Sequence, residues 1–304
     1  MLNNINKLFT KKSFLITLIC ILICSFGAYL IYNKVTSNST IKDKIQNENS
    51  QTLDKPKDTT NNTVEDKSSP KEEVVKEIPM INENIGVPVL YYHSVKETED
   101  NEVTISPQKL RNELRYIKDS GYTTLTMAEL QNHLLNNTAI PEKSIVITFD
   151  DGYMNNYTNA FSILKDLDMK ATIFCITFKL DGQYYLSESA IKNMSDYGID
   201  IESHTAGHPD LTKMTYEQQL SEFVESKEAL ESITDKPVTA VAYPYGNYND
   251  DSIRAAKDAG FALAFTTHLG LADRNDNPFS LDRIYISSSY DMDTFKNLLA
   301  NTKK

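Results

Sequence analysis

Hydrophobic positions are distributed in three different ways along the 304 residues of the chain. Residues 14–32 are nineteen consecutive positions without a charge, whereas residues 33–84 are mostly Asn, Ser, Thr, Lys, Asp and Glu with almost no apolar periodicity. From residue 85 onward, short apolar runs alternate with amphipathic segments. A segment as polar as 33–84 buries too little surface to offset its ordering entropy. The pattern therefore predicts one folded domain, residues 85–304, behind a flexible linker.

The apolar run at residues 14–32 is long enough to cross a hydrocarbon core of about 30 Å. Three lysines, Lys7, Lys11 and Lys12, lie in the basic segment 1–13 before it. Positive charge on that side predicts a cytoplasmic N-terminus. A cleaved signal peptide is the alternative, but no small-x-small cleavage site follows the run. We expect an uncleaved single-pass anchor in the cell membrane, with the folded domain outside the cell.

The alternation of strand-like and helix-like segments predicts an α/β fold with parallel strands and outer helices. Helix start signals occur at Ser106, Thr126, Ser187 and Thr215. About 220 residues with seven or eight such units favour an irregular (β/α) barrel, and a doubly wound open sheet is the alternative. In either fold, functional residues lie at the C-terminal ends of strands. The predicted strands are 87–92, 123–125, 145–149, 171–177, 199–203, 238–242, 262–266 and 283–286.

Charge and composition exclude several classes of function. The chain has a formal net charge of −11. Its first 84 residues hold eleven lysines and ten acids, so the remainder carries −12. A domain this acidic lacks the basic face that nucleic-acid binding needs. Of three cysteines, Cys20 and Cys24 lie in the apolar run, and Cys175 lies in a predicted strand and is interpreted as a core residue. No disulfide is expected.

Two polar motifs at predicted strand ends contain groups that bind metal ions. Thr-Phe-Asp-Asp-Gly at 148–152 closes one strand, and His-Thr-Ala-Gly-His at 204–208 closes another. The adjacent side chains of Asp150 and Asp151 diverge, so one carboxylate can bind a metal while the other stays free as a base. A simple Asp-Gly turn is the competing interpretation of that motif. Two histidines four residues apart suit a shared ion, and with one carboxylate they leave positions open for water.

Three other histidines and a proline turn complete the candidate chemistry. The segment 242–246, Ala-Tyr-Pro-Tyr-Gly, is either a plain turn or one that aims a backbone N–H at a developing oxyanion. His93 closes the first strand of the domain and, in a barrel, faces the same mouth, where it would supply a proton donor. His133 is predicted on an exposed helix flank without a role. For His268 a solvated loop is favoured over a substrate contact.

Together these motifs resemble the polysaccharide deacetylases of carbohydrate esterase family 4, the NodB-homology group, over roughly residues 85–290. Residues 148–152 match the TFDDG motif, 204–208 match H-[ST]-x-x-H, and 244–246 match the end of the third motif. The roles that the resemblance implies are Asp150 as catalytic base, Asp151, His204 and His208 as metal ligands, and the backbone amide of Tyr245, after Pro244, as oxyanion donor.

Three departures from the family pattern refine the resemblance. The family's acid histidine usually lies near the C-terminus, but here His93 precedes the Asp-Asp motif. That order resembles the circularly permuted branch typified by bacterial poly-β-1,6-N-acetylglucosamine deacetylases. The usual third-motif Arg is replaced by Ala242, so Arg283 becomes the candidate that tunes Asp150. The Asp-Trp pair of the fourth motif has no Trp here, and Asp282 is at best a partial substitute for its acid.

The resemblance implies metal-dependent hydrolytic removal of N-acetyl groups from N-acetylglucosamine in an extracellular polysaccharide, most simply poly-β-1,6-N-acetylglucosamine. Peptidoglycan is the alternative substrate, related folds remove O-acetyl groups from xylan, and a catalytically idle polysaccharide-binding protein is the alternative of a different class. One divalent ion is expected, zinc by ligand type, although cobalt or nickel also fits. Because the chain has no Trp, sugar stacking would fall to tyrosines. The candidates are Tyr153, Tyr184, Tyr185, Tyr243 and Tyr248.

Overall fold

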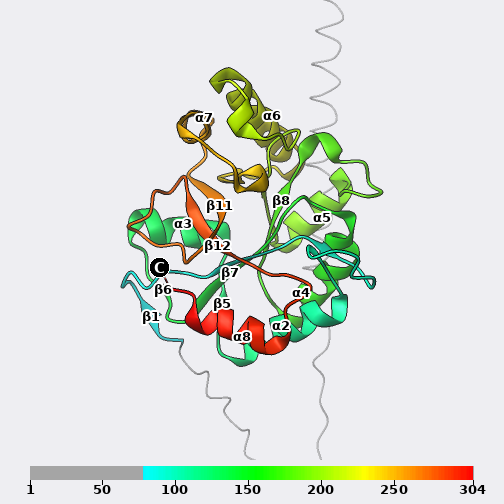
Figure 1. Cartoon of the computed structure of the whole chain (residues 1–304), viewed down its shortest axis with the longest axis vertical. Helices are drawn as coiled ribbons and strands as arrows, with labels where there is room; N and C mark the ends of the chain where they lie inside the picture. Colours follow the sequence, from blue (N-terminus) through cyan, green and yellow to red (C-terminus); the bar gives the residue numbers. More distant parts are fainter. Residues whose placement is uncertain (1–77, 304) are drawn as a thin grey trace, which may run out of the picture. The chain divides into compact units, whose positions relative to one another are not determined.

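The computed structural model describes residues 78–303, and their centre is a closed ring of seven parallel strands (Figure 1). The ring follows chain order, and its last strand, β12, pairs with its first, β2, which also pairs with β7. This closure confirms the barrel and excludes the doubly wound open sheet. The strands are β2 (Val89–Tyr92), β7 (Ser144–Phe149), β8 (Thr172–Cys175), β9 (Asp200–Ser203), β10 (Ala240–Ala242), β11 (Leu263–Leu269) and β12 (Leu281–Tyr285).

Five short strands lie outside the ring. Of the eight predicted strands, the one that lies outside the ring is β5 (Thr123–Thr124), which pairs in parallel with the start of β7. β3 (Ser94–Val95) pairs with β4 (Thr104–Ile105) beside the barrel mouth. β1 (Met80–Ile81) pairs with β6 (Ile140–Pro141), so ordered pairing starts before residue 85, where we expected the domain to begin.

The expected anchor at 14–32, the basic segment 1–13 and most of the expected linker lie outside the described residues. Between residues 78 and 303, no helix has both the length and the hydropathy that crossing a bilayer requires.

Helices connect the strands and surround the ring (Figure 1). The four predicted helix starts are confirmed: each of Ser106, Thr126, Ser187 and Thr215 accepts a backbone N–H from the first turn through its side chain. Such caps satisfy donors that have no partner within the helix. The helices are α2 (Pro107–Asp119), α3 (Met127–Asn136), α4 (Phe161–Leu167), α5 (Glu188–Tyr197), α6 (Tyr216–Thr234), α7 (Asp250–Asp258) and α8 (Met292–Asn301).

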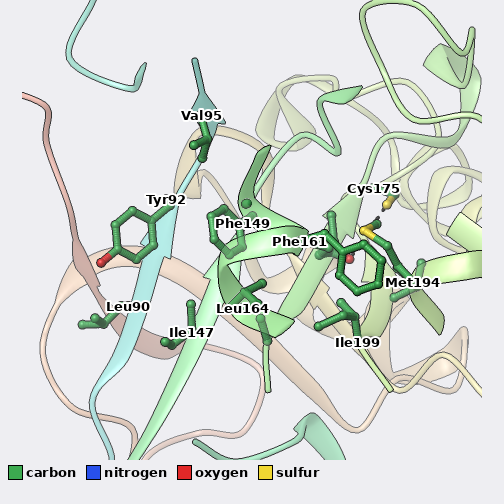
Figure 2. Close-up of a cluster of buried hydrophobic side chains, with 14 of the residues drawn as sticks. Leu90, Tyr92, Val95, Ile147, Phe149, Phe161, Leu164, Cys175, Met194 and Ile199 are labelled. Carbon is green, nitrogen blue, oxygen red and sulfur yellow. Dashed lines mark hydrogen bonds between the residues drawn. The ribbon is translucent and has the colours of Figure 1, made fainter. Parts of the chain in front are cut away.

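The hydrophobic core has an outer and an inner layer. In the outer layer, side chains of α4 and α5 pack against the outward faces of β7 and β8, as Figure 2 shows for Phe161, Met194, Phe149 and Cys175. The inner layer fills the ring with residues such as Val146 and joins them to apolar residues of α3. The alternation along each strand sends one set of side chains to each layer.

The prediction for His133 is wrong, because this side chain is fully buried. Met127 and Leu130 of α3 belong to the inner layer, so the helix packs across the bottom of the ring, and His133 lies on its inward face. The His133 Nδ1 atom lies 2.8 Å from the Thr138 carbonyl oxygen, and Arg274 donates from Nε to the His133 carbonyl at 2.9 Å. His133 therefore has a structural role, through its contacts with Thr138 and Arg274.

Glu113 of α2 has a fully buried carboxyl group. The Tyr92 hydroxyl faces it, yet within residues 78–303 neither group makes a hydrogen bond of good geometry. Burial raises the pKa of Glu113 to about 7; Tyr92 and Lys109 lower it in part, and Glu99 raises it further. The fold thus favours the protonated carboxyl. The stability that the protonated Glu113 carboxyl gives the fold is fully present below pH 4.5, and it is lost as the pH rises through 7.

Replacing Glu113 by Gln should make the protein more resistant to alkaline pH. The free energy of unfolding of Glu113→Gln, relative to the parent, should rise by about 2 kcal/mol between pH 5 and pH 8. Urea unfolding of the full-length chain at both pH values measures this difference. Glu228→Gln, at an exposed position of α6, is the control. Equal pH dependence of the Glu113→Gln variant and the parent would contradict the prediction.

Candidate active site

The Asp-Asp motif is a tight turn immediately after β7. Asp151 has φ 72° and Gly152 has φ 70°, so the chain reverses in left-handed backbone conformations. The left-handed φ of Gly152 favours glycine, and a Cβ atom there would also lie only 3.1 Å from Cys175 Sγ. Cys175 is buried beneath the turn, and burial raises the pKa of its thiol. The prediction that Cys175 is a core residue is confirmed.

Three predicted metal ligands converge above this turn. Asp151 Oδ1 lies 3.6 Å from Nε2 of both His204 and His208, and all three ligand atoms lie within 4.8 Å of one another. Ligand atoms at ordinary zinc distances in a tetrahedron are separated by about 3.4 Å. The donor set and its spacing therefore fit one divalent ion, and this geometry leaves coordination positions for water or substrate.

His204 is oriented by a backbone carbonyl. Its Nδ1 atom lies 2.7 Å from the Ala242 carbonyl oxygen, which can only accept, so Nδ1 carries the proton and Nε2 presents a lone pair toward the triad. Burial and the neighbouring His204 lower the pKa of His208 to about 4, although Asp151 opposes this. The lowered pKa favours the neutral form of the His208 imidazole, which is the form that ligates metals.

The loop that carries the two histidines is attached to α6. Gly207 donates its backbone N–H to Glu222 Oε2 at 2.7 Å, and Ser203 Oγ lies 2.6 Å from Ser226 Oγ. Thr205 and His208 have φ 66° and 61°, which are unusual for residues with side chains. Strained backbone of this kind persists where the surroundings determine it, and it is concentrated at functional sites.

Arg283 lies beside Asp150 inside the ring. Its Nη1 and Nη2 atoms are each 2.8 Å from one Asp150 carboxylate oxygen, and Nε donates to the Thr266 carbonyl at 2.9 Å. The guanidinium also lies 4.3 Å from the centre of the Tyr91 ring. Burial alone would raise the pKa of Asp150, but Arg283 holds it well below the usual value. Asp150 is therefore an ionised carboxylate held in a fixed orientation.

His93 follows β2 at the same mouth. Its ring contacts the rings of Tyr91 and Tyr285, with centroid distances of 5.8 and 6.3 Å. Burial, the largest cause, lowers the pKa of His93 below its usual value, although the charges of Asp150 and Asp151 act in the opposite direction. Its Nδ1 atom has no hydrogen-bond partner in the described part of the chain.

The proline turn after β10 forms a wall of the triad. Pro244 is buried, and Tyr245 has φ 60°. The Tyr245 ring lies 4.6 Å from the His208 ring, edge to face. A Cβ atom at Gly246 would lie 2.1 Å from Thr267 Oγ1, so this turn also requires glycine.

Several sequence candidates lie away from this cluster. Asp282 Oδ1 is 3.9 Å from Nδ1 of His268, and the His268 side chain is exposed. Within residues 78–303, no contact joins Asp282 to His93. Tyr243 is fully buried and cannot reach a ligand. A cavity of about 770 Å³ near Thr123 and Lys170 lies at the starts of the strands, at the opposite end of the ring from the candidate chemistry.

Two supporting groups were absent from the sequence prediction. Asn156 is buried and donates from Nδ2 to the His93 carbonyl at 2.7 Å; its position soon after the Asp-Asp turn was the only available signal. The Ala242 carbonyl orients His204, but a backbone group has no side-chain signature. The sequence prediction includes Ala242 as the first residue of the 242–246 turn and as the replacement for the missing Arg, and neither observation points to its carbonyl.

Comparisons with known proteins agree with this site. The polysaccharide deacetylase family matches residues 137–264. YxkH of Bacillus subtilis, named as a polysaccharide deacetylase, is 36% identical over 201 residues, which cover 66% of this chain and 71% of that protein. A Staphylococcus aureus poly-β-1,6-N-acetyl-D-glucosamine N-deacetylase is 26% identical over 225 residues, 69% of this chain and 75% of that protein.

The fold is also found among solved structures. Streptococcus pyogenes deacetylase PplD, solved in complex with acetate, has a TM-score of 0.68 and 30% identity, covering 73% of this chain and 100% of that one. With the strand-end motifs and the YxkH match, this similarity identifies the barrel as a NodB-homology domain. The chain belongs to the polysaccharide deacetylase family, and it is an enzyme of that family.

Proposed function

We propose that this deacetylase hydrolyses the N-acetyl groups of N-acetylglucosamine residues in poly-β-1,6-N-acetylglucosamine. The observation that carries the proposal is the position of His93. It directly follows the first strand of the ring, at the same mouth as Asp150 and the triad, so an acid and a base flank a metal site. The similarity to the S. aureus deacetylase supports the same substrate.

The residues divide the reaction among them. Asp150, ionised and held by Arg283, takes a proton from the attacking water. The backbone N–H of Tyr245 stabilises the oxyanion of the tetrahedral intermediate, a contribution of about 3 kcal/mol for one such donor. His93 then gives a proton to the nitrogen of the departing amine.

A divalent ion, most simply zinc, held by Asp151, His204 and His208, would polarise the acetyl carbonyl and lower the pKa of water. Cobalt or nickel suits the same donors.

We also propose that residues 14–32 anchor the enzyme in the cell membrane, with the domain at the outer surface. The nineteen uncharged positions and the lysines before them support this arrangement. An extracellular polymer is the substrate that such a position would reach. Protease accessibility of the domain on intact cells tests the orientation.

Chelation should abolish acetate release, and added zinc should restore it. The assay offers β-1,6-N-acetylglucosamine oligomers and peptidoglycan fragments side by side, with and without chelator, and measures free acetate. We expect release from the oligomers, at least ten times faster than from peptidoglycan fragments. Faster release from peptidoglycan would replace the proposed substrate, and full activity in excess chelator would contradict the role of the metal.

A further inference from the structure

Three tyrosine rings form a cluster next to the Asp-Asp turn. The rings of Tyr153 and Tyr185 stack at 5.3 Å with an interplanar angle of 19°. Tyr184 meets both edge to face, at 5.3 and 5.1 Å. Because Tyr153 is two residues after Asp151, this cluster adjoins the metal triad.

The segment that carries Tyr184 is held rigidly. Asp181 Oδ1 accepts the backbone N–H groups of Gln183, Tyr184 and Tyr185 at 2.8 to 3.0 Å. The Tyr184 carbonyl accepts from Met154, and Leu186 donates to the Gly152 carbonyl, each at 2.9 Å. The backbone at Tyr184 therefore has a fixed position relative to the turn that carries Asp150 and Asp151.

Exposed aromatic side chains are concentrated around the site. In the range 78–303, four aromatic side chains are largely exposed: Phe178, Tyr184, Tyr197 and Tyr245. Phe178 donates its backbone N–H to the Ala206 carbonyl, in the loop between the two metal-ligand histidines. Tyr184 is fixed to the Asp-Asp turn, and Tyr245 contacts His208. Of the four, Tyr197 alone, at the end of α5, lies on a segment without such a contact to the site.

We propose that Tyr184 and Phe178 form a stacking platform for the sugar rings that flank the deacetylated residue in the polymer. The apolar C–H face of a pyranose ring packs on an aromatic face, and a chain without Trp must supply that face from Tyr or Phe. Both side chains are exposed by 63% or more at positions fixed to the two metal-site loops. The platform makes the enzyme select long substrates over short ones. The inference rests on the proposed deacetylase function.

The test compares a β-1,6-N-acetylglucosamine pentamer with the dimer, using the full-length chain. For Tyr184→Ala and for Phe178→Ala, the ratio of kcat/KM for the pentamer to that for the dimer should fall about tenfold, mainly through KM. Tyr184→Phe keeps the ring and should retain the parent ratio. Tyr197→Ala, which removes an exposed tyrosine away from the site, is the matched control.

Two results would overturn the platform. One is a parent-like ratio in both alanine variants; the other is an equal loss on pentamer and dimer, which would place Tyr184 and Phe178 in support of the metal site instead. Calorimetric titration with the pentamer gives a separate measurement, in which Tyr184→Ala should bind about tenfold more weakly. If the parent binds the pentamer but releases no acetate, the proposed deacetylation fails while the platform stands.

Discussion

Replacing Asp150 by Asn should reduce acetate release by about 10² to 10⁴ while the protein retains its metal. The amide has the shape of the carboxylate but cannot take a proton from water. Because Asp151, His204 and His208 are unchanged, the metal content measured on the purified variant should equal that of the parent. Thermal unfolding shows separately whether the fold persists.

The control for this experiment is Asp168→Asn, the same change at an exposed aspartate after α4. It should match the parent in acetate release and metal content. If the Asp150→Asn variant kept parental activity, Asp150 would not be the base. If the Asp150→Asn variant lost both its metal and its activity, the division of roles between Asp150 and Asp151 would be wrong.

The second large effect is expected at Arg283. This guanidinium is fully buried and makes two contacts of 2.8 Å with Asp150. Breaking a buried ion pair by removing one partner typically costs about 3 to 5 kcal/mol, because the other charge remains desolvated. Arg283→Met should therefore lower the free energy of unfolding by that amount, and it should reduce activity by releasing Asp150 from its fixed orientation.

A double variant separates the pair from other effects of Arg283. In the Asp150→Asn/Arg283→Met chain, no unpaired ion remains, so its loss of stability should be smaller than the sum for the two single variants. Arg283→Lys keeps the charge but loses the two-pronged geometry, so it should recover stability in part. Strict additivity in urea unfolding would show that the two side chains do not act as a pair.

Much of the fold followed from local signals. The strand positions could be predicted because short apolar runs alternate with capped helices. The capping residues Thr126 and Thr215 are adjacent in sequence to the helix starts that they determine. Ring closure could not be derived in this way, because pairing of β12 with β2 depends on contacts between the two ends of the domain. The predicted exposure of His133 is wrong for a related reason, because a polar residue type does not indicate which distant part of the chain covers its helix.

The candidate site was predictable where chemistry lies in side chains at strand ends. Asp150, Asp151, His204 and His208 form compact motifs, and the fold brings them to one mouth. The backbone contributions, the Ala242 carbonyl above all, leave no mark on residue type. Exposure is likewise a tertiary property, so Tyr243 and Tyr184 were equal candidates until burial distinguished them.

Closure of the ring also has a consequence for the order of events during folding. A ribosome makes β2 first among the barrel strands and β12 last, so Asp150 is synthesised well before the cation that compensates its charge. Until β12 docks, β2 keeps one open edge, of the kind that invites misplaced pairing with other chains. Contacts between distant parts of a chain form slowly. Catalytic competence is thus a late and cooperative property that no N-terminal part of the barrel can acquire by itself.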